Sequence, residues 1–345
     1  MARQTKPSVA SATRHISHDI GPQILLSRQG TTFYPHCSPS LADWRKSDLA
    51  RRPDSPMHST IIQFTPSSTL TAARRLHNSN AEPSGSQRSP ASIPIGVLSF
   101  ASPKRAGGGY LHGGNEQEEG LARCSTLVAS LRTDQAKEFY KTHRRFLSMD
   151  GAGIHDHSMV YSPGVVVFRD DDDEAESNAV STDHPTIPPN NQDSNQKSTF
   201  IPPYTINVLS AVPVNAAAIR QNYLITASDA HVFSDGICDK MRDRMARALR
   251  IFQTRGDQTL VLGAFGCGSC ENKVEMIAEL WAELLVCGER TSGGAKEHKS
   301  KAKYKDVFEE IVFAVPGKHF EPFKKAFEMR VFEAELSDAA SDTDA

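Results

Sequence analysis

Residues 93–119 read IPIGVLSFASPKRAGGGYLHGGNEQEE, and this stretch determines the fold class that we expect. It begins with an apolar run over residues 93–101, which is typical of a buried strand. A glycine-rich loop follows, and a helical stripe of apolar side chains then occupies Leu121, Cys124, Val128 and Leu131. A buried strand, a glycine-rich loop and a helix in this order are typical of an α/β fold.

The same alternation continues along the chain on both sides of this stretch. Strands alternating with helices predict a largely parallel sheet that is covered on both faces. A short apolar segment at residues 20–26 is compatible with a helix or a strand. Further strands are predicted at 60–64, 159–168, 205–212, 259–265 and 311–315, and further helices at 68–76, 241–252, 274–284 and 320–332.

Composition excludes several classes of protein. The 345 residues include 39 Lys and Arg against 41 Asp and Glu, so a net charge of −2 gives no global attraction to nucleic acid or anionic lipid. No apolar run is long enough to cross a bilayer, so we expect no membrane association. Six scattered cysteines favour reduced thiols in an intracellular protein, cytoplasmic or nuclear. Three basic residues and no acidic one in the first 18 residues keep mitochondrial import open: Arg3, Lys6 and Arg14.

The chain is expected to form one domain over residues 15–332. Residues 1–14 and the acidic tail at 333–345 are predicted to be disordered. A polar insertion at about 170–200 begins with the acidic run at 170–174; such a run could bind a metal but is usually solvated. A second polar loop is expected at about 288–303, and its basic part at 296–305 is either solvated or touches an anionic polymer.

The first segment with chemical content is the loop that ends in Gln117-Glu118-Glu119. Gly107, Gly108 and Gly109 let the backbone approach a ligand at the carboxyl end of a strand, where α/β sheets bind ligands. Two adjacent carboxylates at a helix start are stabilised as anions by the helix dipole, whereas burial and like charge raise one pKa. A carboxyl with a raised pKa can act as a general acid, although acidic residues also occur at helix starts without any such role.

The second segment is the turn after the strand at 259–265. Gly266, Cys267, Gly268 and Ser269 form a glycine turn whose backbone N–H groups could hold a phosphate. Cys267 and Cys270 also spell C-x-x-C, but no second pair accompanies them, so a structural role is favoured over redox or zinc chemistry. His155-Asp156-His157 could bind a metal, but it lacks a partner cluster and is expected to be a polar loop.

Together the two segments resemble the microbial-type poly(ADP-ribose) glycohydrolases. The signature of that family is three glycines, a spacer of six to eight residues and Gln-Glu-Glu; here Gly107–Gly109 and Gln117–Glu119 are seven residues apart. Further similarity lies in residues 121–127, 161–170, 262–268 and 313–315, so the resemblance covers about residues 15–332. It implies a three-layer α/β/α macrodomain-like fold with a mixed, largely parallel sheet.

The resemblance also implies an activity. Glu119 would be the general acid/base that hydrolyses the ribose–ribose O-glycosidic bond of poly(ADP-ribose), and no metal or other cofactor would be needed. Glu118 and Gln117 would orient the ribose hydroxyls. The Gly107–Gly109 backbone and the Gly266–Ser269 turn would hold the diphosphate. The partners implied are poly(ADP-ribose) and ADP-ribosylated proteins, for a monomer without a direct nucleic-acid requirement.

Three positions depart from the family pattern. Ser99 stands where an Asn is usual, Cys270 stands in place of an aromatic residue that packs on the scissile ribose, and Arg105-Ala106 replaces Asn-Pro. Loss of the aromatic residue would weaken substrate positioning, which is worth several kcal/mol of barrier. Two alternatives therefore stay open beside the glycohydrolase: an ADP-ribose-binding module with weak catalysis, and a hydrolase of mono-ADP-ribose or another derivative.

Overall fold

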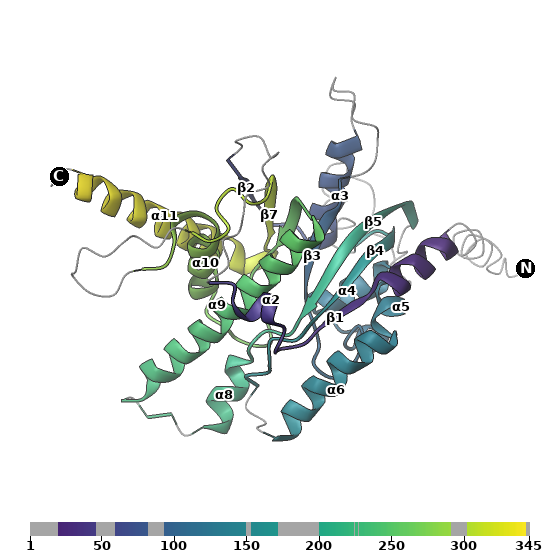
Figure 1. Cartoon of the computed structure of the whole chain (residues 1–345), viewed down its shortest axis with the longest axis horizontal. Helices are drawn as coiled ribbons and strands as arrows, with labels where there is room; N and C mark the ends of the chain where they lie inside the picture. Colours follow the sequence, from purple (N-terminus) through teal and green to yellow (C-terminus); the bar gives the residue numbers. More distant parts are fainter. Residues whose placement is uncertain are drawn as a thin grey trace, which may run out of the picture.

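The computed structural model describes residues 20–45, 59–81, 93–149, 153–171, 200–223, 225–226, 228–290 and 302–342. A seven-stranded sheet runs through the centre in the order β1-β4-β5-β3-β6-β7-β2 (Figure 1). β4 pairs antiparallel with both of its neighbours, β1 and β5, whereas every other pair is parallel. The predicted mixed, largely parallel sheet is confirmed. The strands are β1 (Thr32–Tyr34), β2 (Ile61–Thr65), β3 (Ile95–Phe100), β4 (Met159–Arg169), β5 (Phe200–Ala211), β6 (Thr259–Leu262) and β7 (Glu310–Ala314).

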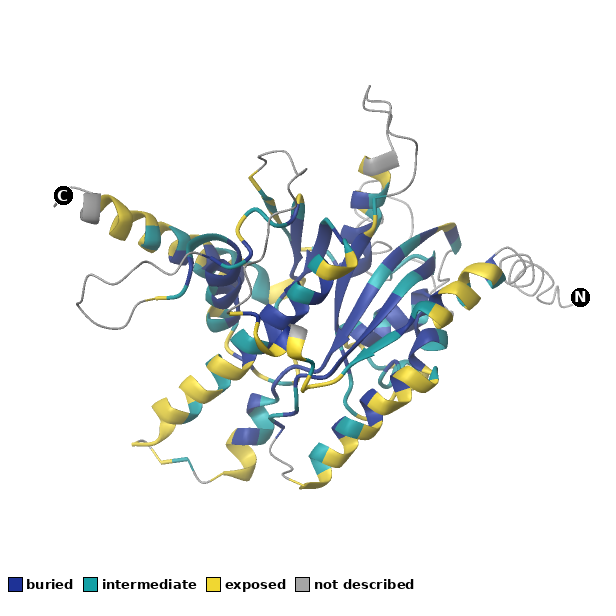
Figure 2. Cartoon of the chain, viewed as in Figure 1, coloured by how far each residue is buried: buried dark blue, intermediate teal, exposed yellow. Residues whose placement is uncertain are grey.

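Helices cover both faces of this sheet, and each face has its own hydrophobic core. One face carries α3 (Thr69–Ala81), α4 (Gln117–Cys124), α5 (Leu127–Leu131) and α6 (Asp134–Met149). The other carries α2 (Pro39–Ala42), α8 (Ala216–Asn222), α9 (Ala230–Arg255), α10 (Val274–Ala282) and α11 (Phe320–Asp342). Figure 2 shows buried residues along the sheet and exposed residues on the outer sides of the helices. The fold therefore has three layers, as expected from the alternation of strands and helices.

The predicted helix after the glycine-rich loop is interrupted. Its apolar stripe is split between α4 and α5 because Ser125 is extended, with φ −140° and ψ 176°, and forms an isolated bridge with Val167. The Ser125 hydroxyl donates to the carbonyl of Leu121 at 2.6 Å, which completes the end of α4. Residues 20–30 are helical, which settles the open alternative at 20–26. The strand β1 and the helices α6 and α8 were not predicted.

The C-terminal helix is longer than the sequence indicated. α11 continues to Asp342, so the prediction of a disordered tail from 333 is wrong over residues 333–342. Glu333 forms an ion pair with Arg290 at 2.8 Å, which ties this extension to the segment after α10. The predicted disorder at 1–14, most of the insertion at 170–200 and residues 291–301 of the second loop lie outside the described residues. Across the described ranges, no helix combines the length and apolar character that spanning a membrane requires.

Candidate active site

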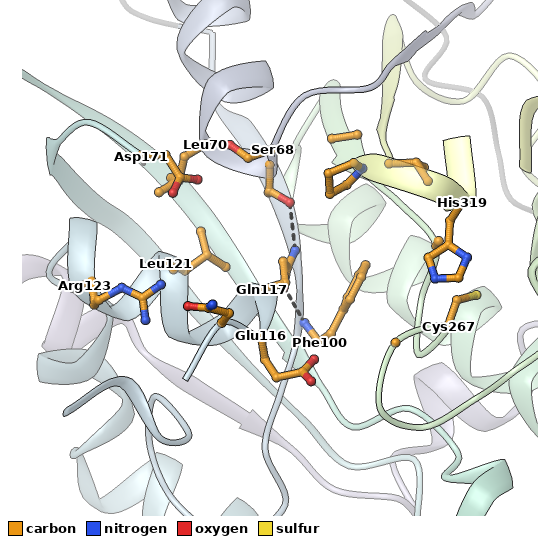
Figure 3. Close-up of a pocket in the computed structure, with 18 residues that line it drawn as sticks. Ser68, Leu70, Phe100, Glu116, Gln117, Leu121, Arg123, Asp171, Cys267 and His319 are labelled. Carbon is orange, nitrogen blue, oxygen red and sulfur yellow. Dashed lines mark hydrogen bonds between the residues drawn. The ribbon is translucent and has the colours of Figure 1, made fainter. Parts of the chain in front are cut away.

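A cleft of about 480 Å³ lies at the carboxyl ends of the parallel strands β2, β3, β6 and β7. This is the edge at which open α/β sheets bind their ligands. Figure 3 shows Gln117 and Phe100 in its middle, Arg123 and Asp171 on one side, and His319 with Cys267 on the other. The residues that line it are Ser68, Thr69, Leu70, Phe100, Asn115, Glu116, Gln117, Gly120, Leu121, Arg123, Asp171, Ala264, Cys267, Gly268, Ala314, Val315, Pro316 and His319.

The glycine-rich loop wraps around the carboxylate of Glu119. The backbone N–H of Gly109 donates to Oε1 of Glu119 at 2.5 Å, and the N–H of Glu116 donates to Oε2 at 2.9 Å. A Cβ on Gly108 or Gly109 would stand 2.9 or 2.8 Å from Oε1, and a Cβ on Gly114 would overlap Oε2. Glycine is therefore required here because the backbone lies against the carboxylate.

Glu118 lies deeper in the protein than Glu119 and is 1% exposed. Its carboxyl group accepts hydrogen bonds from the N–H of Ser102 at 2.7 Å and of Gly107 at 3.2 Å. Burial raises the pKa of Glu118 to about 8; the two N–H donors lower it, and the neighbouring Glu119 raises it further. The sequence predicted that one of the two carboxyls would have a raised pKa, and in the structure it is Glu118.

The three consecutive glycines direct their N–H groups into the protein. Gly107 and Gly109 donate to the two glutamates, and Gly108 donates to the carbonyl of Arg105 at 3.1 Å. These donors are therefore engaged, and the expectation that the Gly107–Gly109 backbone holds a diphosphate through them does not fit this conformation. The loop instead binds the carboxylates.

Gln117 links the start of α4 to the end of β3. Its Oε1 accepts from the N–H of Phe100 at 2.8 Å, and its Nε2 donates to the hydroxyl of Thr69 at 3.1 Å (Figure 3). Nε2 also donates to the carbonyl of Leu98 at 2.8 Å. Both ends of the amide are thus bonded within the protein. Gln117 fixes the position of the helix that carries Glu118 and Glu119.

The second predicted segment reaches the cleft from the opposite side. Gly266 has φ +76°, and a Cβ there would stand 2.6 Å from Pro213, so the turn requires glycine. Gly268 and Ser269 are exposed, and across this described turn their backbone N–H groups have no hydrogen-bond partner. These two groups are available to an anionic ligand; that the turn binds a phosphate remains a prediction.

One residue that holds this turn in place could not be recognised in the sequence. Asn272 is buried, and its Nδ2 donates to the carbonyls of Val214 at 2.7 Å and Gly266 at 3.0 Å, which holds the turn closed. Nothing in the local pattern distinguished this Asn from other loop residues.

Burial raises the pKa of the Cys267 thiol to about 12 and that of the Cys270 thiol to about 11, and all six cysteines are free.

Glu116 and His319 line the cleft but were not selected from the sequence. The carboxylate of Glu116 faces the glycine turn, with Oε2 3.6 Å from the position of a Cβ on Gly268. His319 lies between Pro316 and α11 on the far wall (Figure 3). Glu116 directly precedes the Gln117–Glu119 segment and could have been selected with it, whereas nothing near His319 in the sequence indicated a site.

The structure also shows where the three positions that differ from the family pattern lie. Ser99 on β3 is fully buried, and its hydroxyl has no hydrogen-bond partner among the described residues. The same holds for Ser210, its register partner on β5. Cys270 is half-buried beside Glu116, whose charge contributes to the raised pKa of that thiol. Arg105 is exposed at the start of the glycine-rich loop.

The His155-Asp156-His157 segment is a loop, as expected, but its two histidines are buried. The guanidinium of Arg244 donates to His157 Nδ1 at 3.3 Å and to the His155 carbonyl at 3.1 Å. Burial lowers the pKa of His155 to about 3, so its ring is neutral at physiological pH. In the part of the chain that the structure describes, no three His, Cys, Asp or Glu side chains are grouped to hold a metal ion.

Comparisons with known proteins point to one family. Residues 8–170 match the model of the microbial-type PARG catalytic domain. No curated protein matches the sequence. Among solved structures, the chain is similar to poly(ADP-ribose) glycohydrolase from Thermomonospora curvata, with 29% identity, a TM-score of 0.64 and coverage of 90% of this chain and 88% of that one.

Two further similar structures contain ligands. One is the Thermomonospora curvata enzyme bound to the inhibitor ADP-HPD, with 28% identity, a TM-score of 0.61 and the same coverage. The other is poly(ADP-ribose) glycohydrolase from Deinococcus radiodurans in complex with ADP-ribose, with 26% identity, a TM-score of 0.63 and coverage of 90% of this chain and 98% of that one. Residues 8–170 thus match the microbial-type PARG catalytic domain, and the chain as a whole is similar to these poly(ADP-ribose) glycohydrolases in its fold and in its Gly-Gly-Gly and Gln-Glu-Glu segments.

Proposed function

We propose that this chain is a poly(ADP-ribose) glycohydrolase that cleaves ribose–ribose O-glycosidic bonds and releases ADP-ribose. The observation that supports this most directly is the clamp on Glu119: two backbone N–H groups fix its oxygens at 2.5 and 2.9 Å, and its chain neighbours Gln117 and Gly120 line the cleft of about 480 Å³. Each carboxylate oxygen has a second lone pair, so the clamp orients the group without saturating it. A fixed carboxyl group next to a ligand cleft is what glycoside hydrolysis requires.

In the proposed reaction Glu119 acts twice. As an acid it gives its proton to the leaving ribose oxygen while the bond between that oxygen and the anomeric carbon breaks. As a base it then takes a proton from the water whose oxygen bonds to the oxocarbenium-like carbon, which restores the acid form and releases two hydroxyl-bearing products. Glu118 would support this role by holding the N–H groups of Ser102 and Gly107, which position the loop.

The diphosphate of the substrate is assigned to the Gly266–Ser269 turn. The N–H groups of Gly268 and Ser269 are exposed and unpartnered within the described turn, whereas those of Gly107–Gly109 are engaged. Backbone N–H groups in such a turn bind phosphate oxygens well because they cost no side-chain ordering. Gln117 would then act by positioning α4, since both ends of its amide are bonded within the protein.

The decisive experiment compares wild type with Glu119→Gln. We expect both proteins to bind ADP-ribose in a calorimetric titration and only wild type to release ADP-ribose from automodified polymer. Glu309→Gln, an exposed glutamate just before β7, is the matched control and should retain full activity. Equal release by wild type and Glu119→Gln would refute the role of Glu119, and no ADP-ribose binding by any variant would refute the proposed function.

A second candidate is an ADP-ribose-binding module with weak turnover. It is favoured by the position of the carboxylates, since the cleft is lined by Glu116 and Gln117 while Glu118 and Glu119 lie behind the loop. Cys270 in place of an aromatic platform favours it as well. Binding by wild type without release from either poly- or mono-ADP-ribosylated protein would establish this alternative. We further propose an intracellular monomer that acts on ADP-ribosylated proteins.

A further inference from the structure

A second cavity lies on the outer side of the glycine-rich loop. Its volume is about 210 Å³, several times the roughly 30 Å³ that one water molecule occupies in the liquid. Gly108 lines this cavity and also lies against the Glu119 carboxylate, so the two are separated by a single residue of the loop. The other residues that line it are Arg105, Ala106, Tyr110, Leu111, His112 and Arg132.

Positive charge dominates this cavity. Arg105 comes from the loop, Arg132 from the end of α5, and both are exposed. Neither guanidinium group makes a hydrogen bond or ion pair with any residue that the structure describes, and no acidic side chain lines the cavity. The nearby carboxylate of Asp134 is paired with Lys137 at 2.7 Å.

Further basic groups extend the same surface. Arg144 of α6 donates to the backbone carbonyl of Lys104 at 3.4 Å, which places two more cations beside Arg105. In contrast, exposed arginines on the other side of the sheet are paired, such as Arg45 with Glu289 and Arg290 with Glu333. Unpaired guanidinium groups around a cavity suit a phosphate-bearing ligand, because each can donate two parallel hydrogen bonds to phosphate oxygens.

We propose that the cavity formed by Arg105, His112 and Arg132 binds the pyrophosphate of a second ADP-ribose unit, the one that stays on the polymer when the first is released. The inference rests on the proposed function. In poly(ADP-ribose) a pyrophosphate lies on each side of every ribose–ribose bond. The cleft with the Gly266–Ser269 turn takes one, and the cavity on the far side of the Glu119 loop is placed for the other. The site makes the enzyme prefer a substrate of at least two units.

The test uses the double variant Arg105→Gln/Arg132→Gln. We expect the KM for polymer to rise about threefold to tenfold, the range that losing two exposed ion pairs gives, with kcat unchanged. Affinity for an isolated dimer of ADP-ribose should fall by the same factor, whereas affinity for free ADP-ribose should stay at the wild-type value. The dependence of polymer binding on salt should also become weaker. The matched control is Arg45→Gln/Arg290→Gln, which removes two exposed charges from the opposite side of the sheet and should change none of these quantities.

Three results would overturn the proposal. The first is an unchanged KM for polymer in a double variant that unfolds like wild type. The second is an equal loss of affinity for free ADP-ribose, which would place the arginines at the first unit. The third is an equal loss for a single-stranded oligonucleotide of matched charge, which would indicate a general polyanion surface. Failure of wild type to release ADP-ribose from polymer is a separate result and concerns the proposed function alone.

Discussion

The backbone N–H of Gly109 donates a hydrogen bond to Oε1 of Glu119 across 2.5 Å. With the N–H of Glu116 on Oε2, both oxygens of the proposed acid/base are held by backbone and not by other side chains. The conformation of the glycine-rich loop therefore sets the orientation of the carboxylate. Substitutions in this loop should change catalysis through Glu119, even where they contact no substrate.

Gly114→Ala tests this dependence. A Cβ at residue 114 would overlap Oε2 of Glu119, so the carboxylate must move. Displacement of a reacting group by about 1 Å costs about 100-fold in rate, so we expect kcat to fall by about that factor with ADP-ribose affinity retained. Gly236→Ala in α9, where nothing lies within 4 Å of the added atom, is the control and should be fully active. Wild-type kcat in Gly114→Ala would contradict the clamp.

The pKa of Glu118 predicts how stability depends on pH. Burial raises this pKa from 4.5 to about 8, so between these values the folded chain holds a proton that the unfolded chain has released. The contribution of Glu118 to the free energy of unfolding should therefore fall as pH rises toward about 8. Buried histidines act in the opposite direction near pH 6.5, because burial lowers the pKa of His143 to about 4 and that of His155 to about 3, so that only the unfolded chain takes up these protons. The contribution of Glu118 is therefore measured as the difference between wild type and a Glu118 variant, in which the histidines cancel.

Glu118→Gln should remove this slope. The amide cannot accept from both Ser102 and Gly107, so the variant should be less stable than wild type by about 1–3 kcal/mol near pH 6.5. That deficit should shrink toward pH 8, because only wild type then buries a charge. Urea unfolding at both ends of the window measures the two slopes. Parallel slopes for the two proteins would rule out Glu118 as the titrating group.

The C-x-x-C pair is predicted to be unreactive. Burial raises the pKa of Cys267 to about 12 and that of Cys270 to about 11, so both thiols are protonated at neutral pH, and a thiol is a poor nucleophile. Iodoacetamide should modify the exposed Cys37 well before either of them, as mass spectrometry of the intact and digested protein would show. Rapid formation of a Cys267–Cys270 disulfide on mild oxidation would revive the redox interpretation.

Local patterns were sufficient to predict the two loops of the site and every strand of the described sheet except β1. The apolar run before Phe100 and the glycines around residue 108 carry their conformational preferences in short segments, so periodicity and glycine content reveal them. The break at Ser125 was hidden because it depends on a bridge to Val167, which is 42 positions further along the chain. Tertiary pairing of this kind overrides a helical stripe.

The role of each individual residue in the site could not be predicted from the sequence. The pattern showed three glycines and two glutamates, but not that the N–H groups of the glycines are consumed by the carboxylates. It also gave no reason to single out Asn272, since its role depends on a hydrogen bond to the carbonyl of Val214, which lies 58 positions earlier in the chain. Both sets of hydrogen bonds depend on how the chain folds in three dimensions, which a local sequence pattern does not show.

Glu116→Gln should strengthen ligand binding. The carboxylate of Glu116 faces the glycine turn assigned to the diphosphate, 3.6 Å from the position of a Cβ on Gly268. Two like charges a few ångströms apart repel by about 1 kcal/mol in well-solvated surroundings, so removing the charge should lower the Kd for ADP-ribose about fivefold. Because the effect is electrostatic, the difference between the two proteins should shrink at high salt.

Glu328→Gln serves as the charge-matched control, since Glu328 lies on α11 and pairs with Lys324. Its Kd for ADP-ribose should equal that of wild type at every ionic strength. Calorimetric titration of the three proteins at low and high salt separates the possibilities. A weaker Kd in Glu116→Gln would mean that this carboxylate accepts hydrogen bonds from the ligand, and the diphosphate would then have to lie away from Gly268.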